Sequence, residues 1–459
     1  MIVPENRKPS SSLGWLLMIL FLPVIGVPLF LILGSPYVRR RRTRIQARAN
    51  ILLEKGTAGL PPAPESVTLP EDLSGVVNLS RALTALPMVT GRNHGVEMDY
   101  KASIQRMTRL VEQATTSIHA EIYIMARDAV TEDFFRALEA AVRRGVTVRV
   151  LLDHLGSRKY PGFRRFLQGM TAAGIEWHLM MPFQPLRGKA RRIDLRNHRK
   201  LLVVDGTAAI MGSQNLIAAT YGSKKNEKIG RRWNDITVEL SGEIIDIHAY
   251  RDFDGRELEG GVQTSLHAPA PAVGGRINAL QLIPSGPGFR TEPNLKAFAS
   301  LIYTAKHRLA IVSPYFVPDE SIFAAIVTAA FRGVQVELYV SEVADQYMVD
   351  RAQSSYYQAL LDAGVTIYRF PAPEVLHTKC FLIDDTCAVM GSSNMDLRSF
   401  GLNYEISLLA YGGDVVDQIS EVIATYAARS SVLDEASWQE RSFGRRYMES
   451  VMRLTSALQ

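Results

Sequence analysis

Two copies of one short pattern contain the residues of this chain that could do chemistry. Each copy is a histidine, a lysine two residues later, and an aspartate after four further apolar residues. Fourteen residues after each histidine the chain reads Gly-Ser-x-Asn. The residues are His198, Lys200, Asp205, Ser213 and Asn215 in the first copy, and His377, Lys379, Asp384, Ser392 and Asn394 in the second. Identical spacing in two places is hard to obtain by chance, so the two copies predict a duplicated site.

These residue types suit a phosphate or a phosphodiester. The apolar runs 201–204 and 380–383 have strand length and end at an aspartate turn, which predicts buried strands. Residues i and i+2 of a strand share a face, so each histidine is expected beside its lysine. Imidazole, ammonium, hydroxyl and amide groups supply a nucleophile and hydrogen-bond donors, but there are too few carboxylates for Mg²⁺ or Ca²⁺. We therefore expect no metal and no other cofactor. A single His-x-Lys would indicate only a surface pair, and the second copy reverses that interpretation.

The duplicated pattern resembles the phospholipase D superfamily, and the flanking sequence resembles the bacterial cardiolipin synthases. The similar stretches are 313–319 and 391–399, the second running on to Asn403 and Glu405. The resemblance covers the chain from about Val96 to the C-terminus. It implies an α/β fold of two tandem phospholipase D-like domains, with mixed β-sheets flanked by helices and a pseudo-twofold relation. It also implies that the two histidines face each other across one phosphate.

In that family one histidine attacks phosphorus to give a phosphohistidine, and the other protonates the leaving alcohol. We expect one neutral and one protonated imidazole, and the resemblance favours His198 as the nucleophile. The lysines, with Ser213, Asn215, Ser392 and Asn394, are expected to hold the phosphate oxygens.

Each imidazole also needs an acid to orient it. Glu405, which lies 28 residues after His377, matches the family position, and Asp235 is the candidate in the first half. The aspartates of the two motifs, Asp205 and Asp384, belong to the implied catalytic set. Their place across an apolar strand from the histidines favours a structural role.

The N-terminal segment predicts one transmembrane helix over residues 13–34. Residues 9–38 contain no charged side chain, and 15 of the 21 residues in 13–33 are Leu, Ile, Val or Phe. Six arginines follow between Arg39 and Arg48, which predicts that everything after them is cytoplasmic. A cleaved signal peptide is disfavoured because the apolar stretch is too long and lacks a small-x-small site. Cardiolipin synthases often have two such spans, whereas this sequence predicts one.

The rest of the chain predicts a repeated βαβ organisation. Segments 118–125 and 146–152 are predicted strands, and 104–114, 130–144 and 415–428 are predicted helices. The stretch 141–148 matches 329–336 at an offset of 188 residues, which indicates an internal duplication. The predicted divisions are 1–12 tail, 13–34 transmembrane helix, 35–85 basic juxtamembrane segment and linker, 86–264 first domain, 265–288 connecting loop and 289–459 second domain.

Three further features bound the interpretation. The only cysteines, Cys380 and Cys387, lie in apolar stretches and predict reduced core residues rather than a disulfide framework. The basic loop 183–196 precedes the first histidine, and Arg191, Arg192 or Arg196 could guide lipid headgroups. Residues 441–454 predict a basic amphipathic helix, more often a packing element than a membrane contact.

The leading hypothesis is a phosphatidyltransferase that joins two phosphatidylglycerols into cardiolipin and releases glycerol. Its expected partners are phosphatidylglycerol, other anionic phospholipids and the membrane, and its expected place is the bacterial inner membrane as a single-pass protein. The alternatives are hydrolysis of a phospholipid, use of phosphatidylethanolamine, and an inactive membrane scaffold. Nucleic acid is the weaker substrate because the positive charge gathers beside the predicted membrane helix. The oligomeric state is not predicted.

Overall fold

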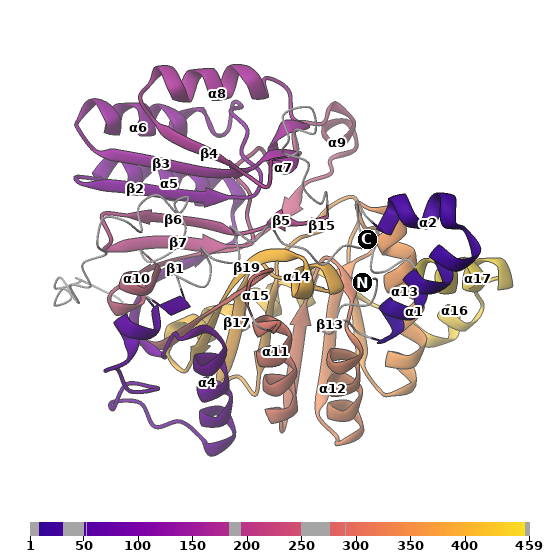
Figure 1. Cartoon of the computed structure of the whole chain (residues 1–459). Coiled ribbons are helices and arrows are strands. Elements are labelled where there is room, and N and C mark those ends of the chain that lie inside the picture. Colours follow the sequence, from indigo (N-terminus) through magenta and orange to yellow (C-terminus); the bar gives the residue numbers. More distant parts are fainter. Residues whose placement is uncertain are drawn as a thin grey trace.

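The computed structural model describes residues 9–30, 50–51, 53–182, 194–248, 276–289 and 291–454. Across these ranges, one continuous mixed sheet of 16 strands runs through the molecule, with helices packed on it (Figure 1). The α/β fold with two tandem halves is therefore as predicted, but the halves share a single sheet.

The two halves have the same strand order. From the centre outward, the first half runs β1 (Val89–Glu97), β9 (Thr237–Ser241), β7 (Ala208–Gly212), β6 (Lys200–Val204), β2 (Ser117–Ile122), β3 (Thr147–Asp153) and β4 (Glu176–Met180). The second runs β10 (Ile277–Ser285), β19 (Asn403–Tyr411), β17 (Cys387–Gly391), β16 (Cys380–Ile383), β11 (Arg308–Val312), β13 (Gln335–Ser341) and β14 (Thr366–Phe370), with β20 (Ser431–Val432) at the edge. The halves join where β1 pairs antiparallel with β10 in the register Val89↔Leu280. The matched order shows the predicted duplication in three dimensions.

The helices follow the predicted βαβ organisation. In the first half they are α5 (Tyr100–Gln113), α6 (Glu132–Arg143), α7 (His154–Arg158), α8 (Phe163–Ala172), α9 (Lys224–Ile229) and α10 (Glu243–His248), with α4 (Glu71–Thr84) ahead of β1. In the second half they are α11 (Pro293–Thr304), α12 (Glu320–Phe331), α13 (Tyr347–Asp362), α14 (Leu397–Gly401), α15 (Gly413–Arg429), α16 (Glu435–Gln439) and α17 (Phe443–Leu454). The helices predicted over 104–114, 130–144 and 415–428 correspond to α5, α6 and α15.

The central strands are buried on both faces, which explains their uninterrupted apolar sequence. In β16, Phe381 and Ile383 pack in one core cluster, with residues of α11 and α12. Cys380 and Leu382 point into a second cluster, with residues of α15. Both cysteines are free and buried, as predicted, and burial raises the pKa of each thiol to about 12.

Part of the predicted connecting loop 265–288 is a strand. Residues 277–285 form β10 at the centre of the sheet, although the surrounding Pro, Gly and Ala predict a loop. Every residue from Asn278 to Ser285 is buried. The strand is covered on both sides, so it lacks the polar and apolar alternation that marks a half-exposed strand.

The N-terminal segment differs from the single predicted helix. Residues 9–29 form two helices, α1 (Pro9–Phe21) and α2 (Pro23–Leu29), that pack against each other. Pro23 occupies the first turn of α2, and Leu22 has non-helical dihedrals (φ −134°, ψ 59°), so the chain breaks there. Over the described part of the chain, no helix has both the length and the apolar character to cross a membrane. Residues 31–34 and the arginines of 39–48 lie outside the described residues.

The aspartates of the two motifs cap turns at the far ends of β6 and β16. The Asp205 carboxylate accepts hydrogen bonds from the backbone N–H groups of 115, 116 and 117, at 2.7–2.8 Å. Asp384 does the same for 306, 307 and 308, at 2.7–3.2 Å. Both residues have positive φ, 53° and 50°, which aspartate and asparagine tolerate better than most side chains. Their contacts are structural, as their position in the sequence favoured.

We predict that Asp205→Ala lowers the free energy of unfolding by about 1–3 kcal/mol, because three backbone donors lose their acceptor and alanine disfavours the left-handed conformation. Asp205→Asn keeps an acceptor and the conformation, so its loss should be smaller. Thermal unfolding of the three proteins measures the difference. Equal stability of the alanine variant and the wild type would contradict the structural role.

Candidate active site

Two short parallel strand pairs cross between the halves and set the position of both histidines. β5 (Arg196–Asn197) pairs with the start of β19, and β15 (Val375–Leu376) pairs with β8 (Trp233–Asn234). Each pairing continues into the next residue: the His198 N–H donates to the Tyr404 carbonyl at 2.9 Å, and the His377 N–H donates to the Asn234 carbonyl at 2.8 Å. Each histidine therefore lies beside the residue that precedes the acid of the opposite half.

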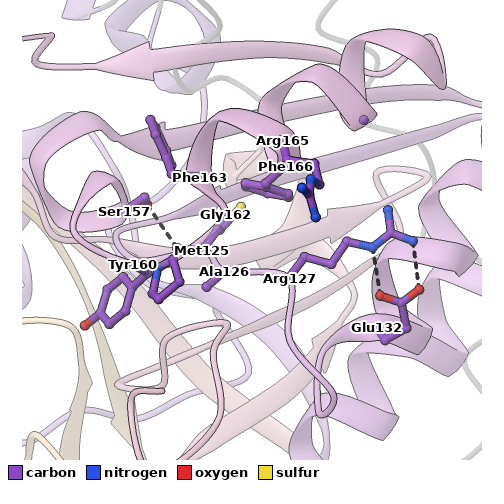
Figure 2. A pocket seen from close by; sticks show the side chains of 12 residues that line it. Met125, Ala126, Arg127, Glu132, Ser157, Tyr160, Gly162, Phe163, Arg165 and Phe166 are labelled. Atoms are coloured by element: carbon purple, nitrogen blue, oxygen red, sulfur yellow. Dashed lines mark hydrogen bonds and ion pairs between the residues drawn. The ribbon is translucent and has the colours of Figure 1, made fainter. Parts of the chain in front are cut away.

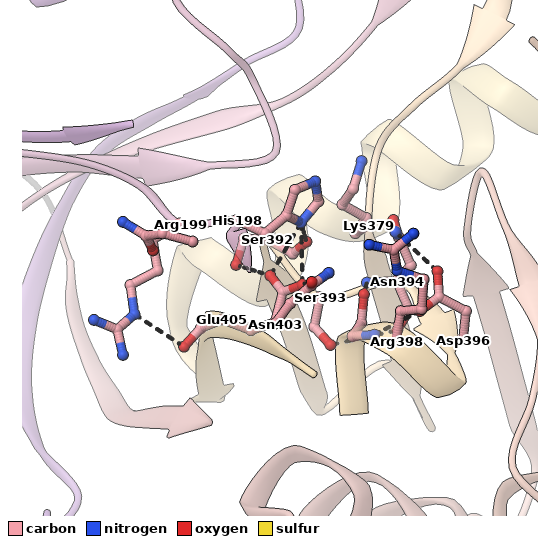
Figure 3. Close-up of polar contacts among 12 residues, drawn as sticks. His198, Arg199, Lys379, Ser392, Ser393, Asn394, Asp396, Arg398, Asn403 and Glu405 are labelled. Carbon is pink, nitrogen blue, oxygen red and sulfur yellow. Dashed lines mark hydrogen bonds and ion pairs between the residues drawn. The ribbon is translucent and has the colours of Figure 1, made fainter. Parts of the chain in front are cut away.

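The orienting acids are consequently exchanged between the halves. His198 Nδ1 lies 3.1 Å from both carboxylate oxygens of Glu405 (Figure 3). His377 Nδ1 lies 2.7 Å from Asp235 Oδ1. Asp235 and Glu405 therefore each contact the histidine of the other half, whereas the sequence offsets predict that each contacts the histidine of its own half. The sequence offset from a histidine to the acid of its own half could not show this pairing.

The carboxylates fix the tautomer of each imidazole. An ionised carboxylate only accepts hydrogen bonds, so Nδ1 carries the proton and Nε2 carries the lone pair. Burial opposes ionisation of Glu405, but the neighbouring His198 and Lys200 lower its pKa. Burial likewise opposes ionisation of Asp235, and His377 and Lys379 lower its pKa. Each Nε2 is therefore available as a nucleophile or, once protonated, as an acid.

Both imidazoles are neutral at pH 7. Burial lowers the pKa of His198 and of His377 to about 4, against the opposing charges of their carboxylates. These lowered pKa values favour the neutral form of both rings before substrate binds, whereas the sequence predicts one neutral and one protonated imidazole. A bound phosphodiester anion would favour protonation of one ring, since a nearby negative charge raises the pKa of a histidine.

Both histidines line one cavity of about 360 Å³ that is formed by both halves. Asn215 and Asn394 line the same cavity, at the ends of the two Gly-Ser-x-Asn stretches. Asn215 is held by two contacts, because its Oδ1 accepts from the Ile124 N–H and its Nδ2 donates to the Tyr221 hydroxyl. Asn394 Nδ2 donates to Asp396 at 3.1 Å.

The lysines and serines lie behind the histidines and the acids. Lys200 Nζ donates to the His198 carbonyl at 2.5 Å, and Lys379 Nζ donates to the His377 carbonyl. Burial lowers the pKa of Lys200 well below its usual value, and that of Lys379 to about 8. Ser392 Oγ donates to Glu405 at 2.5 Å.

Ser213 occupies the matching place in the first half. Its Oγ accepts the Ile236 N–H at 3.1 Å and donates to the Ile236 carbonyl at 3.4 Å. Ser213 also helps to lower the pKa of Asp235. Ser392 is thus bonded to Glu405 and Ser213 to the backbone of Ile236, and the phosphate contacts expected of both serines stay a prediction.

The structure adds residues that sequence reasoning missed. The Tyr123 ring lies 4.8 Å from the His198 ring, centroid to centroid, and Tyr123 lines the cavity. Asn403, Asp396 and Arg398 also line it, and all three belong to the stretch that carries the family resemblance. Of the basic loop, Arg191 and Arg192 lie outside the described residues. Arg196 is buried, lines the cavity and forms an ion pair with Asp153 at 3.2 Å.

A second cavity, of about 410 Å³, lies beside the turn between α7 and α8 (Figure 2). Its walls include Met125, Phe163 and Phe166. Its Arg127 is paired with Glu132 at 2.8 Å and with Glu139 at 2.5 Å. No residue of the two motifs lines it, so the chemistry belongs to the smaller cavity.

Comparison with known proteins agrees with this geometry. The family described as "Cardiolipin synthase, PLD-like domain" matches residues 107–235 and 298–426, and the family "Phospholipase D-nuclease N-terminal" matches 1–35. A cardiolipin synthase of Geobacillus kaustophilus is 31% identical over 463 residues, covering 99% of this chain and 90% of that protein. A cardiolipin synthase A of Serratia proteamaculans is 32% identical over 469 residues, covering 100% and 94%. The crystal structure of a phosphatidylserine synthase of Haemophilus influenzae superposes with a TM-score of 0.59 at 15% identity, covering 83% of this chain and 96% of that one, which is a likeness of fold.

We predict that stability falls as the pH decreases from about 6.5 to 4, because the unfolded histidines bind protons in this range and the buried ones do not. Each such histidine contributes up to about 1.4 kcal/mol per pH unit. The glutamine variant His377→Gln keeps a donor for Asp235 but cannot titrate, so its thermal midpoint should depend less on pH in this window. An identical slope for the variant and the wild type would show that His377 titrates normally in the folded protein.

Proposed function

The chain belongs to the phospholipase D superfamily, with two phospholipase D-like domains in one molecule, and from this we propose that it condenses two phosphatidylglycerols into cardiolipin and releases glycerol. The observation that carries the proposal is the pair of neutral imidazoles on one cavity, each held through Nδ1 by a carboxylate of the opposite half. Relatives that bear the name cardiolipin synthase, matched over 90% and 94% of their length, support this substrate class.

In the first step, Nε2 of one histidine attacks the phosphorus of phosphatidylglycerol, and we assign this role to His198. A nitrogen–phosphorus bond forms, and the bond from phosphorus to the glycerol oxygen breaks. That oxygen takes a proton from Nε2 of His377, which becomes protonated when the anionic substrate binds. The products of this step are glycerol and a phosphatidyl-histidine.

In the second step, the terminal hydroxyl of another phosphatidylglycerol gives its proton to Nε2 of His377 and attacks the same phosphorus. The bond from His198 to phosphorus breaks, and cardiolipin leaves. The proton given in the first step is regained in the second, so the site returns to its starting state. Glu405 and Asp235 stabilise each imidazolium as it forms and hold both rings in place.

The lysines supply positive charge close to the reacting phosphate. Each ammonium has three donors, of which one holds the carbonyl of its own histidine. Because both lysines are buried, their charges act on the transition state with little screening by water. Asn215 and Asn394 bring neutral amides to the same cavity.

Access for lipids fits a protein that works at a membrane surface. Large apolar side chains are exposed on α17, where Phe443 is 77% and Tyr447 62% exposed, and at the start of α13, where Tyr347 is 62% exposed. The start of α13 adjoins the cavity, which Gln346 and Val349 line. α17 packs on α13. It carries three arginines, Arg445, Arg446 and Arg453, which favour anionic lipid. The inner membrane and the cytoplasmic orientation remain predictions from residues 39–48.

We expect the purified protein to convert phosphatidylglycerol in mixed micelles into equal amounts of cardiolipin and glycerol. His198→Ala and His377→Ala should each lose about a thousandfold or more in rate, since each removes a nucleophile or an acid–base group. His307→Ala, at an exposed histidine, is the matched control and should retain full activity. Phosphatidic acid as the sole lipid product would contradict transfer and indicate hydrolysis.

A substrate with an activated leaving group should separate the two histidines. A phosphatidyl ester of p-nitrophenol needs no proton on its leaving oxygen, so His377→Ala should still release a burst of p-nitrophenolate and retain a phosphorylated His198. His198→Ala should give no burst. The opposite pattern would assign the nucleophile to His377, and peptide mass spectrometry of the trapped enzyme would identify the modified residue.

A further inference from the structure

The proposed condensation, on which the following inference rests, brings two phosphate groups into one cavity. One belongs to the donor lipid and reacts between the histidines. The other belongs to the acceptor phosphatidylglycerol, and it stays intact three carbon atoms from the attacking hydroxyl. A buried phosphodiester anion needs positive charge or hydrogen-bond donors of its own.

Two arginines from opposite halves meet on the His198 side of the cavity. Arg398, in α14, donates from Nη2 to the Asp194 carbonyl at 3.1 Å, and Arg196 lies two residues further along that same segment. Both arginines line the cavity. Burial raises the pKa of Tyr123 to about 12, and the charges of Arg398 and Arg196 both act against this rise. Tyr123 lines the same cavity as both arginines, and its ring contacts the His198 ring.

The carboxylates around these arginines are already engaged. Asp153 pairs with Arg196 at 3.2 Å, and it also accepts the N–H groups of 155, 156 and 197. Asp396 accepts Asn394 Nδ2 and the Ser399 N–H. Arg398 forms an ion pair with no carboxylate in the described part of the chain, and Figure 3 shows it beside Asn394 and Asp396. A guanidinium has five donors in a planar fork that matches a phosphate, so Arg398 keeps donors for an anion.

These arginines break the symmetry of the site. The residue two positions before the histidine is Arg196 in the first copy and Val375 in the second. The residue four positions after the Gly-Ser-x-Asn asparagine is Arg398 in the second copy and Ala219 in the first. The reacting phosphate lies between two equivalent histidines, whereas the intact phosphate lies on one side only. Lys159 and Arg231 also line the cavity, and Arg196 and Arg398 are the pair carried by the segment that leads into His198 and by the helix bonded to it, which matches the second requirement.

We propose that Arg196 and Arg398 form a second anion subsite beside His198, which binds the intact phosphate of the acceptor phospholipid. Arg398 is its main ligand because Arg196 is already paired with Asp153. The subsite selects acceptor alcohols that carry a phosphodiester, and it places their hydroxyl toward the histidines. It makes no contact with the bond that breaks when the donor lipid reacts.

The test compares two acceptors for one donor. Cardiolipin formation uses phosphatidylglycerol as acceptor. Exchange of labelled glycerol into phosphatidylglycerol uses glycerol, a neutral alcohol, as acceptor, and it has the same first step. Arg398→Gln should lower cardiolipin formation by about tenfold to a hundredfold through a weaker acceptor interaction, and leave glycerol exchange within about twofold of the wild type. Arg398→Lys, which keeps the charge, should recover part of the loss. Arg109→Gln, at an exposed arginine of α5, removes one charge away from the cavity and should change neither reaction.

An equal loss of rate in both reactions would overturn the subsite. It would mean that Arg398 acts in the common first step, or that it only holds the segment at Asp194 in place. Unchanged rates in both reactions would overturn it as well. If Arg398→Gln does not fold, Arg398→Lys and Arg196→Gln give the same comparison of acceptors. A wild-type protein that exchanges glycerol but forms no cardiolipin would instead refute the proposed function, and this result is visible before any variant is made.

Discussion

Two histidine–carboxylate hydrogen bonds that cross between the halves hold this structure and its site together. Glu405 and Asp235 are almost completely buried, and a buried carboxylate is costly unless it is paired. Each contacts a histidine of the other half, so neither half contains a complete histidine–carboxylate pair. The short pairs of β5 with β19 and of β15 with β8 bring each histidine to its acid, and the pairing of β1 with β10 fixes the halves in one sheet. Folding of the duplicated chain and assembly of the site are therefore the same event.

The two halves share the residues that position the histidines, and they differ in the buried residues next to them. Both keep the strand order, the buried lysine behind the histidine, the serine next to the acid and the aspartate that caps a turn. They differ at the residue between the histidine and the lysine of each motif. The first half has buried charges, with Arg199 paired to Glu121, where the second has Thr378 bonded to Tyr426. An almost symmetric pair of imidazoles is thus set in unequal surroundings, which suits a reaction whose two lipids have different roles.

Much of the fold could be predicted from local pattern. The apolar runs that became β6 and β16 and the periodicity of α5, α6 and α15 depend on neighbours in sequence, so the sequence contains the signal. The contact between Asp235 and His377 depends on the pairing of β15 with β8, in which each strand has two residues. Strands this short have no recognisable pattern of alternation in the sequence. β10 was hidden because burial on both faces removes alternation. Ser392 has the chemistry of a phosphate ligand, and only the position of Glu405 Oε2, 2.5 Å away, shows that its hydroxyl is already used.

We propose that both histidines act in turn on one phosphorus atom through a covalent intermediate. The stereochemistry at that atom tests it most directly. Phosphatidylglycerol made chiral at phosphorus by one sulfur atom would be converted to the thio analogue of cardiolipin, and the configuration of the product would be determined by ³¹P NMR. Two in-line displacements, one at each step, predict net retention. Net inversion would mean a single direct displacement by the acceptor hydroxyl, and would contradict a phosphohistidine held between the two halves.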